Sequence, residues 1–197
     1  LVSNTMITAL LEFTKNYIKF LYGLRRLVFR KIIRRLDLVI GVSRAIFEDM
    51  GEYRSNMRYL IHGVSLTDEE IRLAKNLRRI PKKKNIILFS ARWRIEKGLI
   101  ESLIVLRKIL KKKDIKLLIT GKPRRFFIIR DIINRLGIKN NVIFTGYLPR
   151  EELLKVKRQA KLMIYPSHID PFPYSVLESL YVGTPVVAYD IPALSIN

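Results

Sequence analysis

The sequence predicts an α/β protein whose larger part is a doubly wound parallel sheet with helices on both faces. From Asn85 onward, short apolar segments rich in β-branched residues alternate with segments of helical periodicity. These apolar segments are nearly continuous, as is typical of strands buried on both faces, and short loops join them to the helices. Hydrophobic residues make up 49% of the 197 residues, which favours a packed core over disorder.

The first third of the chain is expected to hold one long basic helix and a small strand–helix–strand unit. Residues 6–36 have helical periodicity with a bend at Gly23, residues 36–43 and 57–64 resemble strands, and residues 44–51 a helix. The apolar stripe of the long helix is Leu10, Leu11, Tyr17, Ile18, Leu21, Leu24, Val28 and Ile32. Basic residues lie largely away from it, namely Lys15, Lys19, Arg26, Arg30 and Arg34.

Two interpretations of this helix remain open. It can lie on an anionic membrane surface, because a basic amphipathic helix binds there through its apolar face and its charges. It can equally pack on its own domain with a solvated charged face. The formal net charge of +21 favours polyanionic partners in general and does not choose among nucleic acid, lipid headgroups and phosphorylated ligands.

Residues 67–84 end in a Pro-Lys-Lys-Lys run and are interpreted as a solvated linker. We therefore expect a partial Rossmann-like segment at 1–66 and a Rossmann-like domain at 85–197. In the second domain, strands are predicted at 85–91, 115–121, 141–148, 161–167 and 184–190, and helices at 98–112, 124–137, 150–160 and 173–183.

Several functional classes lack support in the sequence. The chain has no cysteine, which excludes disulfides and thiolate metal sites and fits a cytoplasmic protein. It has no pattern of a signal peptide, no apolar run near the roughly 18 residues that span a bilayer, and no paired-histidine metal motif. No aromatic-basic motif or recognition helix indicates specific nucleic-acid binding.

Two loops at the carboxyl ends of predicted strands carry the residues with the clearest chemistry. Arg92 and Lys97 could converge on one anion, since Arg grips phosphate bidentately and Lys supplies a point charge. In the second loop, Asp170 precedes and Glu178 follows a helix start near Tyr174, where backbone N–H groups can bind an anion. Carboxylates placed there can accept hydrogen bonds from sugar hydroxyls. Taken singly, these charges also fit plain surface residues or partners of the helix dipole.

Together, these motifs resemble the C-terminal half of the GT-B glycosyltransferases, specifically the retaining family 4. The resemblance covers roughly residues 30–193, with the motifs in the family's order and spacing. It is carried by NIILFSARWRIEKG, KLLITG, NVIFTGYLPREEL and KLMIYPSHIDPFPYSVLESLYVGTPVVAYDIPAL. Upstream, RRLDLVIGVSRAIFEDM and LIHGVS look like the last strand, helix and strand of the family's N-terminal domain.

The resemblance implies a role for each candidate residue. Arg92 and Lys97 match the basic pair that holds the donor diphosphate and supports its departure. Glu178 matches the acid that binds the donor ribose, and Asp170 matches the acid that contacts the transferred sugar. The family's amide cradle for sugar and phosphate corresponds here to Phe172, Pro173, Tyr174 and Ser175. The implied donor is a nucleoside-diphosphate sugar, used with retention and without a metal or other cofactor, because protein charges act on the leaving group.

This sequence also departs from the family's pattern. Asp170 stands where the family usually has Glu, Pro173 and Ala91 where it has Gly, and His62 and Ser65 where it has Asn and Asp. These changes could shift donor preference. The resemblance further implies that most of an acceptor-binding N-terminal domain and the last C-terminal helices fall outside these 197 residues.

Three functional interpretations follow. The first is a glycosyltransferase, or its donor-binding part, whose acceptor is an unidentified glycan, lipid or protein. The second is an inactive module that only binds a nucleotide sugar. The third is a basic protein that binds polyanions or membranes, for which steep salt dependence would be the sign.

Overall fold

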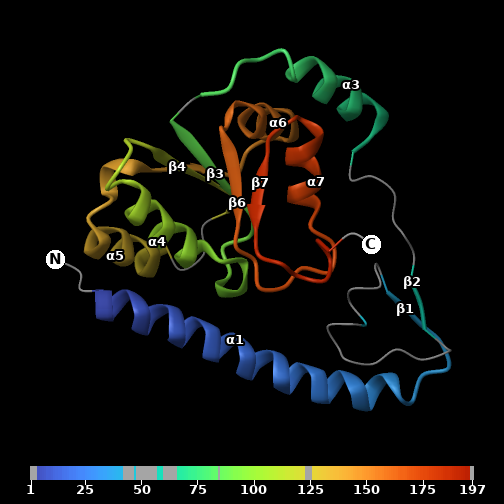
Figure 1. Cartoon of the computed structure of the whole chain (residues 1–197). Helices are drawn as coiled ribbons and strands as arrows, with labels where there is room; N and C mark the ends of the chain where they lie inside the picture. The colour runs from blue at the N-terminus through green and yellow to red at the C-terminus, as the bar shows by residue number, and fades with distance from the viewer. Residues whose placement is uncertain are drawn as a thin grey trace.

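The computed structural model describes residues 4–41, 47, 57–59, 66–83, 85–122 and 126–195. Its larger part is a five-stranded parallel sheet in the order β5-β4-β3-β6-β7 (Figure 1). The strands are β3 Ile86–Ser90, β4 Lys116–Thr120, β5 Val142–Gly146, β6 Leu162–Tyr165 and β7 Val186–Ala188. The predicted parallel sheet is confirmed.

Helices cover both faces of this sheet because alternate strand residues point to opposite sides. From β3, Ile87 and Phe89 pack in the cluster that contains α4 and α5, whereas Leu88 packs with Met163 and Val176 on the side of α6 and α7. The four helices are α4 Leu99–Ile109, α5 Phe126–Leu136, α6 Arg150–Gln159 and α7 Tyr174–Tyr181. Two 3-10 turns, η1 Ile95–Lys97 and η2 Lys139–Asn141, complete the domain.

The strand order gives the sheet a switch point between β3 and β6. The chain adds β4 and β5 on one side of β3, then returns to add β6 and β7 on the other. In open α/β sheets, ligands bind outside the carboxyl ends of the strands at such a switch point. The loops after β3 and β6, together with α7, carry all the site residues predicted from the sequence.

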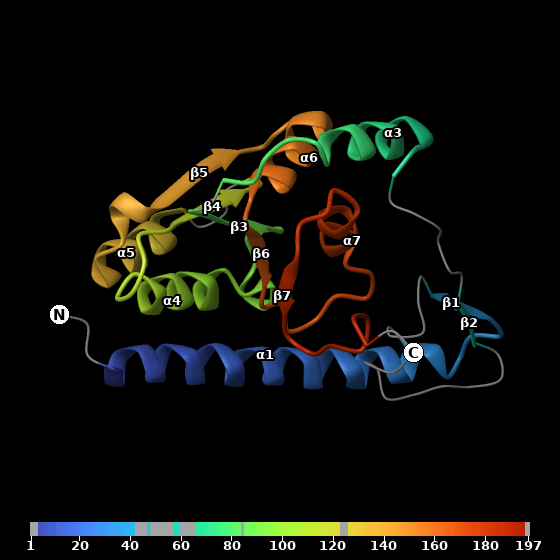
Figure 2. The ribbon, with the colours of Figure 1, turned by 45° about the horizontal axis from the view of Figure 1, so that its top comes forward.

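Helix α1 (Asn4–Ile33) continues without interruption through Gly23, so the expected bend is not found (Figure 2). A glycine at an exposed helical position lowers helix propensity but keeps the backbone hydrogen bonds. Among the α1 side chains whose burial the structure describes, Thr14, Ile18 and Ile33 are buried, and of these Ile18 belongs to the predicted stripe. Five members of that stripe are exposed, namely Tyr17, Leu21, Leu24, Val28 and Ile32.

The small unit after α1 contains a parallel pair, β1 Val39–Gly41 and β2 Met57–Tyr59, with Val39 opposite Met57. The helix expected at 44–51 lies outside the described residues apart from Phe47, which packs on Ile33. His62 and Ser65 also lie outside them. Within the described ranges, no helix has both the length and the apolarity needed to cross a bilayer.

The segment interpreted as a linker contains α3 (Asp68–Leu77), which begins with a capping box. The Thr67 hydroxyl accepts from the Glu70 N–H, and Glu70 accepts from the Thr67 N–H at 2.8 Å. Near the end of α3, Leu77 packs with Leu154 and Val182. Helix α3 is therefore attached to the helices of the sheet domain, beside α6 and α7 (Figure 1).

The lysine run after α3 is not wholly solvated, so that interpretation is wrong at Lys82. Its Nζ donates to Thr184 Oγ1 at 2.7 Å and to the Ala160 carbonyl at 3.1 Å. Partial burial and the nearby Arg158 charge lower the pKa of Lys82. The side chain thus joins the end of this segment to the sheet domain.

Candidate functional site

A cleft of about 870 Å³ opens at the carboxyl ends of β3, β4 and β5, against α7. Four predicted site residues line it, namely Arg92, Tyr174, Ser175 and Glu178. Sequence reasoning missed the other lining residues, which are Ser90, Ala91, Trp93, Arg94, Thr120, Gly121, Lys122, Tyr147, Leu148, Arg150 and Leu153. The structure therefore brings one predicted cation and one predicted acid into the same cavity.

Lys97 and Asp170 form an ion pair of their own, with Nζ 2.6 Å from Oδ2 and both side chains largely buried. The Tyr165 hydroxyl donates to the same carboxylate oxygen, and the Phe172 N–H donates to the other at 3.1 Å. Burial and the adjacent carboxylate raise the pKa of Tyr165, while the charge of Arg92 opposes this shift. Tyr165 is thus a neutral donor to Asp170.

Gly98 sets the close approach of the two loops. It has φ 77° and joins η1 to α4. A Cβ at this position would lie 2.0 Å from the Pro166 carbonyl oxygen, so only glycine leaves room for the second loop. Lys97 Nζ also donates to the Ile169 carbonyl at 2.9 Å. Backbone contact and side-chain contact therefore place Asp170 against Lys97.

Helix α7 begins at Tyr174, as predicted, but Pro173 is its N-cap and not its first helical residue. The ψ of Pro173 is 69°, outside the helical region, which excludes it from the first turn. The N–H groups of Val176 and Leu177 donate to the Pro173 carbonyl. Pro173 therefore closes the first turn of α7, and this turn presents Tyr174 and Ser175 to the cleft.

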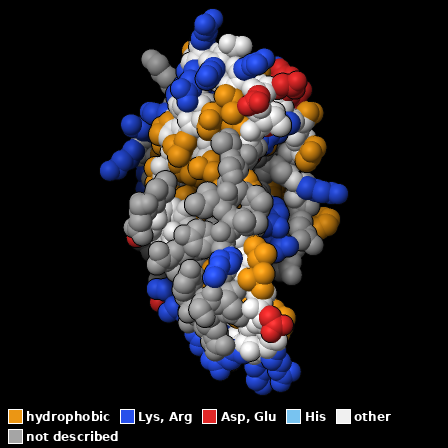
Figure 3. Space-filling view, turned by 90° about the vertical axis from the view of Figure 1, so that its right-hand side faces the viewer, with side chains coloured by type: hydrophobic (Ala, Val, Ile, Leu, Met, Phe, Trp, Pro, Cys, Tyr) orange, Lys and Arg blue, Asp and Glu red, His pale blue; other side chains and the backbone are white. Residues whose placement is uncertain are grey.

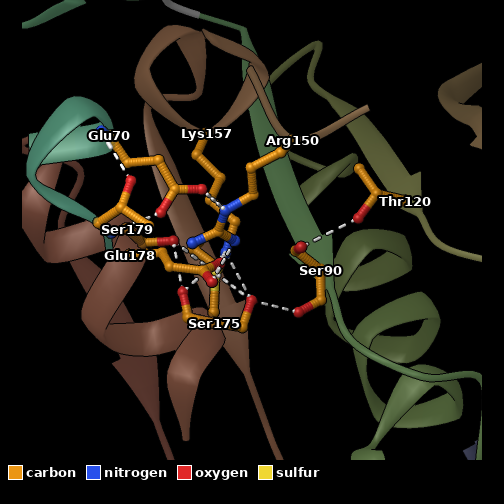
Figure 4. A network of polar contacts seen from close by, with 10 residues as sticks. Glu70, Ser90, Thr120, Arg150, Lys157, Ser175, Glu178 and Ser179 are labelled. Carbon is orange, nitrogen blue, oxygen red and sulfur yellow. Dashed lines mark hydrogen bonds and ion pairs between the residues drawn. The ribbon is translucent and has the colours of Figure 1, made fainter. Parts of the chain in front are cut away.

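Glu178 is buried and held by two cations (Figure 4). Its Oε2 lies 2.8 Å from Lys157 Nζ, and its Oε1 accepts from Arg150. Lys157, whose side chain is fully buried, also donates to the Ser175 carbonyl at 2.9 Å and the Ser175 hydroxyl at 2.7 Å. The acid predicted to face a sugar is therefore oriented by a network from α6 and α7.

Arg150 connects this network to α3, because its Nε lies 2.5 Å from Glu70 Oε1. Burial works against the charge of Arg150, but the hydrogen bonds that it donates to Glu70 and Glu178, together with their negative charges, outweigh burial and raise the pKa of Arg150. Arg150 and Lys157 were absent from the sequence prediction. The sequence of α6 nevertheless indicates that Lys157 is buried, because it follows Leu154 by three residues and so falls on the buried stripe of the helix.

The burial of Lys157 predicts a pH-dependent stability. Burial lowers its pKa to about 8 from 10.5, although the Glu178 charge pulls it upward and Arg150 adds to the lowering. Between about pH 8 and 10.5 the folded chain has lost a proton that the unfolded chain retains, so this group adds stability as pH rises. Below pH 8, Lys157 is protonated in both the folded and the unfolded chain, so this increase in stability is absent. By pH 9.5 the increase in the free energy of unfolding amounts to about 2 kcal/mol.

The measurement is the free energy of unfolding in urea at pH 7 and pH 9.5. The stability of the unaltered chain relative to Lys157→Met should rise between these values. Lys155→Met, on the exposed side of the same helix, should show no such change in relative stability. Parallel pH profiles for the unaltered chain and Lys157→Met would contradict the assigned cause.

Within the part of the chain that the structure describes, no three His, Cys, Asp or Glu side chains gather as a metal site would require. The polar groups that line the cleft are instead the cationic side chains of Arg and Lys, several hydroxyl groups and the Glu178 carboxylate. This arrangement can neutralise an anion and bind hydroxyl groups in the same cavity.

Comparisons with known proteins support the fold. The model of the family Glycosyl transferases group 1 matches residues 70–195. An uncharacterized glycosyltransferase of Methanocaldococcus jannaschii is 27% identical over 167 residues, which cover 79% of this chain and 43% of the relative. The alpha-monoglucosyldiacylglycerol synthase of Streptococcus pneumoniae is 27% identical over 177 residues, 84% of this chain and 40% of the relative. The chain thus spans less than half the length of either relative.

Among solved structures, Anabaena HepE in complex with UDP and glucose is similar, with a TM-score of 0.60 and 19% identity. The alignment covers 81% of this chain and 46% of HepE. At this identity the likeness shows a shared fold.

Proposed function

Because the chain belongs to the glycosyl transferases group 1 family, we propose that it is the donor-binding half of a glycosyltransferase that uses a nucleoside-diphosphate sugar. One observation carries the proposal. The cleft at the switch point of the sheet combines the exposed guanidinium of Arg92 with the buried carboxylate of Glu178. HepE, which shares the fold, binds UDP and glucose, and this supports the same donor class here. In this proposal, residues 85–197 bind the donor and residues 1–66 belong to the acceptor side.

Each site residue then has a distinct role. Arg92 binds the diphosphate from the cleft, and Lys97 neutralises the charge that develops on it as it leaves. Glu178 accepts hydrogen bonds from the ribose hydroxyls, and Asp170 accepts them from the transferred sugar. The segment from Phe172 to Ser175, which leads into α7, lies beside sugar and phosphate, and among these residues Ser175 supplies the backbone N–H, because Pro173 has none and the N–H groups of Phe172 and Tyr174 donate to Asp170 and to the Phe172 carbonyl.

We propose transfer with retention of configuration and without a metal. The bond from the anomeric carbon to the diphosphate breaks as the acceptor oxygen bonds to the same face of that carbon. The departing phosphate oxygen takes the acceptor proton. The positive charges of Arg92 and Lys97 support the part of this assignment that needs no metal, because fixed protein charges can stabilise the leaving group.

The test is calorimetric titration with a panel of UDP, GDP, ADP and CDP sugars. At least one sugar nucleotide should bind the unaltered chain. Glu178→Gln should lower the affinity for that sugar nucleotide ~10-fold or more, because a charged hydrogen-bond acceptor is lost. Glu152→Gln, on the exposed face of α6, is the control and should bind normally. Equal affinities for the unaltered chain and Glu178→Gln would show that the cleft is wrongly assigned.

We further propose that α1 attaches the protein to the cytoplasmic face of an anionic membrane. Five members of its apolar stripe are exposed, including Leu24 and Val28, and Arg30 and Lys31 lie in its last turn. Lys and Arg side chains gather at the end of the molecule where α1 ends (Figure 3). Apolar burial and attraction to anionic headgroups would then act together. The relative that makes a glucosyldiacylglycerol is consistent with a lipid acceptor.

Vesicle co-sedimentation tests this proposal. Vesicles of phosphatidylcholine with phosphatidylglycerol should bind the chain more strongly than phosphatidylcholine alone. Leu24→Glu should weaken binding roughly tenfold, since an apolar side chain no longer enters the lipid. Val105→Glu changes an exposed apolar residue of α4 and should have no effect. Equally weak binding to both kinds of vesicle would count against the membrane proposal.

A further inference from the structure

We propose that Lys157 is a positioning residue for ribose recognition, because its buried ammonium orients the Glu178 carboxylate toward the cleft. This inference rests on the proposed function and deepens it. Glu178 lines the cleft, whereas Lys157 does not, so Lys157 acts through Glu178 and not on the ligand.

The ammonium of Lys157 has no donor left for a ligand. A protonated lysine offers three N–H donors. In the structure they meet three acceptors, which are the carbonyl and hydroxyl oxygens of Ser175 and Oε2 of Glu178. With all three satisfied and the side chain fully buried, Lys157 is fixed in place.

The Glu178 carboxylate, in contrast, keeps acceptor capacity. A carboxylate has about four lone-pair sites. Lys157 occupies one on Oε2 and Arg150 one on Oε1, so each oxygen retains one site. A ribose ring presents two adjacent hydroxyls, and the two remaining sites can accept one hydrogen bond from each. The two cations thereby set the rotation of the carboxylate.

Lys157 also joins the elements that form this side of the cleft. Its bonds to Ser175 tie α6 to α7, and the Ser175 hydroxyl donates to the Ser90 carbonyl at the end of β3 (Figure 4). Glu178 follows Ser175 by three residues, so the two lie on the same face of α7. The position of the carboxylate relative to β3 therefore depends on Lys157.

Stability alone is a poor explanation for this buried charge. Replacing a buried ion pair with apolar residues of similar size is often neutral or stabilising, because burial removes both ions from water. Arg150, the other partner of Glu178, is 36% exposed and lines the cleft, whereas Lys157 is fully buried and does not line it. Lys157 is therefore the partner of Glu178 that a ligand in the cleft does not contact.

The experiment compares ribose with deoxyribose. UDP, GDP, ADP and CDP are each titrated beside their 2′-deoxy forms, against the unaltered chain, Lys157→Met and Lys155→Met. The unaltered chain and Lys155→Met should prefer the ribose form of the tightest binder ~10-fold or more, since one hydrogen bond to a charged acceptor is at stake. Lys157→Met should lose most of that preference.

If Lys157 had a purely structural role, its loss would weaken the binding of the ribose and deoxyribose forms equally. An unchanged ratio of these two affinities in Lys157→Met therefore overturns this inference and leaves the proposed function intact. If the unaltered chain binds none of the four diphosphates, or binds both forms equally, the proposed function fails and the inference with it. Glu178→Gln/Lys157→Met guards against misfolding, because it leaves no unpaired buried charge. The preference of this double variant for the ribose form should equal that of Glu178→Gln. A smaller preference in the double variant would show that Lys157 acts independently of Glu178 and would refute the proposal.

Discussion

Replacing Lys97 with methionine is expected to weaken the binding of a nucleoside-diphosphate sugar by ~10- to 100-fold. Lys97 supplies a buried positive charge in η1, after β3, and its 2.6 Å pair with Asp170 orients the acid proposed for the sugar. Both contributions disappear in Lys97→Met. Isothermal titration with the sugar nucleotide that binds the unaltered chain measures the loss. Lys155→Met removes a charge of the same type at an exposed site and should bind normally.

Loss of stability must be separated from loss of binding in this variant. Lys97→Met leaves Asp170 with only the Tyr165 and Phe172 donors, and an unpaired, largely buried carboxylate destabilises the fold. Lys97→Met/Asp170→Asn removes both charges and should regain stability in urea unfolding without regaining affinity. If the double variant binds the donor as well as the unaltered chain, Lys97 has no direct role in binding.

Replacing Gly98 with alanine is expected to cost more stability than any other glycine-to-alanine change in the sheet domain. Two effects add together at this position. The left-handed φ of 77° costs an L-residue ~1–2 kcal/mol. In addition, the new Cβ would lie 2.0 Å from the Pro166 carbonyl oxygen, which displaces the backbone of the loop that carries Asp170. Urea unfolding should show a loss of several kcal/mol, and donor binding should fall with it.

Two other glycines are matched controls. Gly137 has φ 66° and open space where an alanine methyl group would lie, so Gly137→Ala measures the backbone cost alone. Gly23 lies inside α1 with open space around it, so Gly23→Ala should stabilise that helix by ~0.5–1 kcal/mol. A loss in Gly98→Ala no larger than that in Gly137→Ala would show that the contact with Pro166 is unimportant.

The sheet domain could be predicted because its pattern is local. Each strand of 85–197 is a short apolar run flanked by turns, and all five appear in the structure. The same local reasoning placed Arg92 and Glu178 near one edge, since parallel strands end at the same edge of a sheet. Both residues line the cleft.

The partners of charged residues inside the fold could not be predicted in this way. Lys82, in a lysine-rich run, donates to Thr184, and Lys157 is fully buried against Glu178. The residue type alone does not distinguish an exposed lysine from a buried one, and the partners of these two lysines lie far away in the chain. In α1, five members of the predicted stripe are exposed while Ile18 is buried, because apolar side chains occupy more than one face of the helix and the neighbouring elements decide which face is covered.

The sequence by itself determined the alternation of strands and helices and the residues at the strand ends, because periodicity and turn chemistry act over a few neighbouring positions. Only the tertiary structure decided that β6 lies beside β3, that Lys97 meets Asp170, and that two cations hold Glu178. Those contacts join residues far apart in the chain. Their existence depends on strand order and on the packing of α6 against α7, which no local pattern encodes.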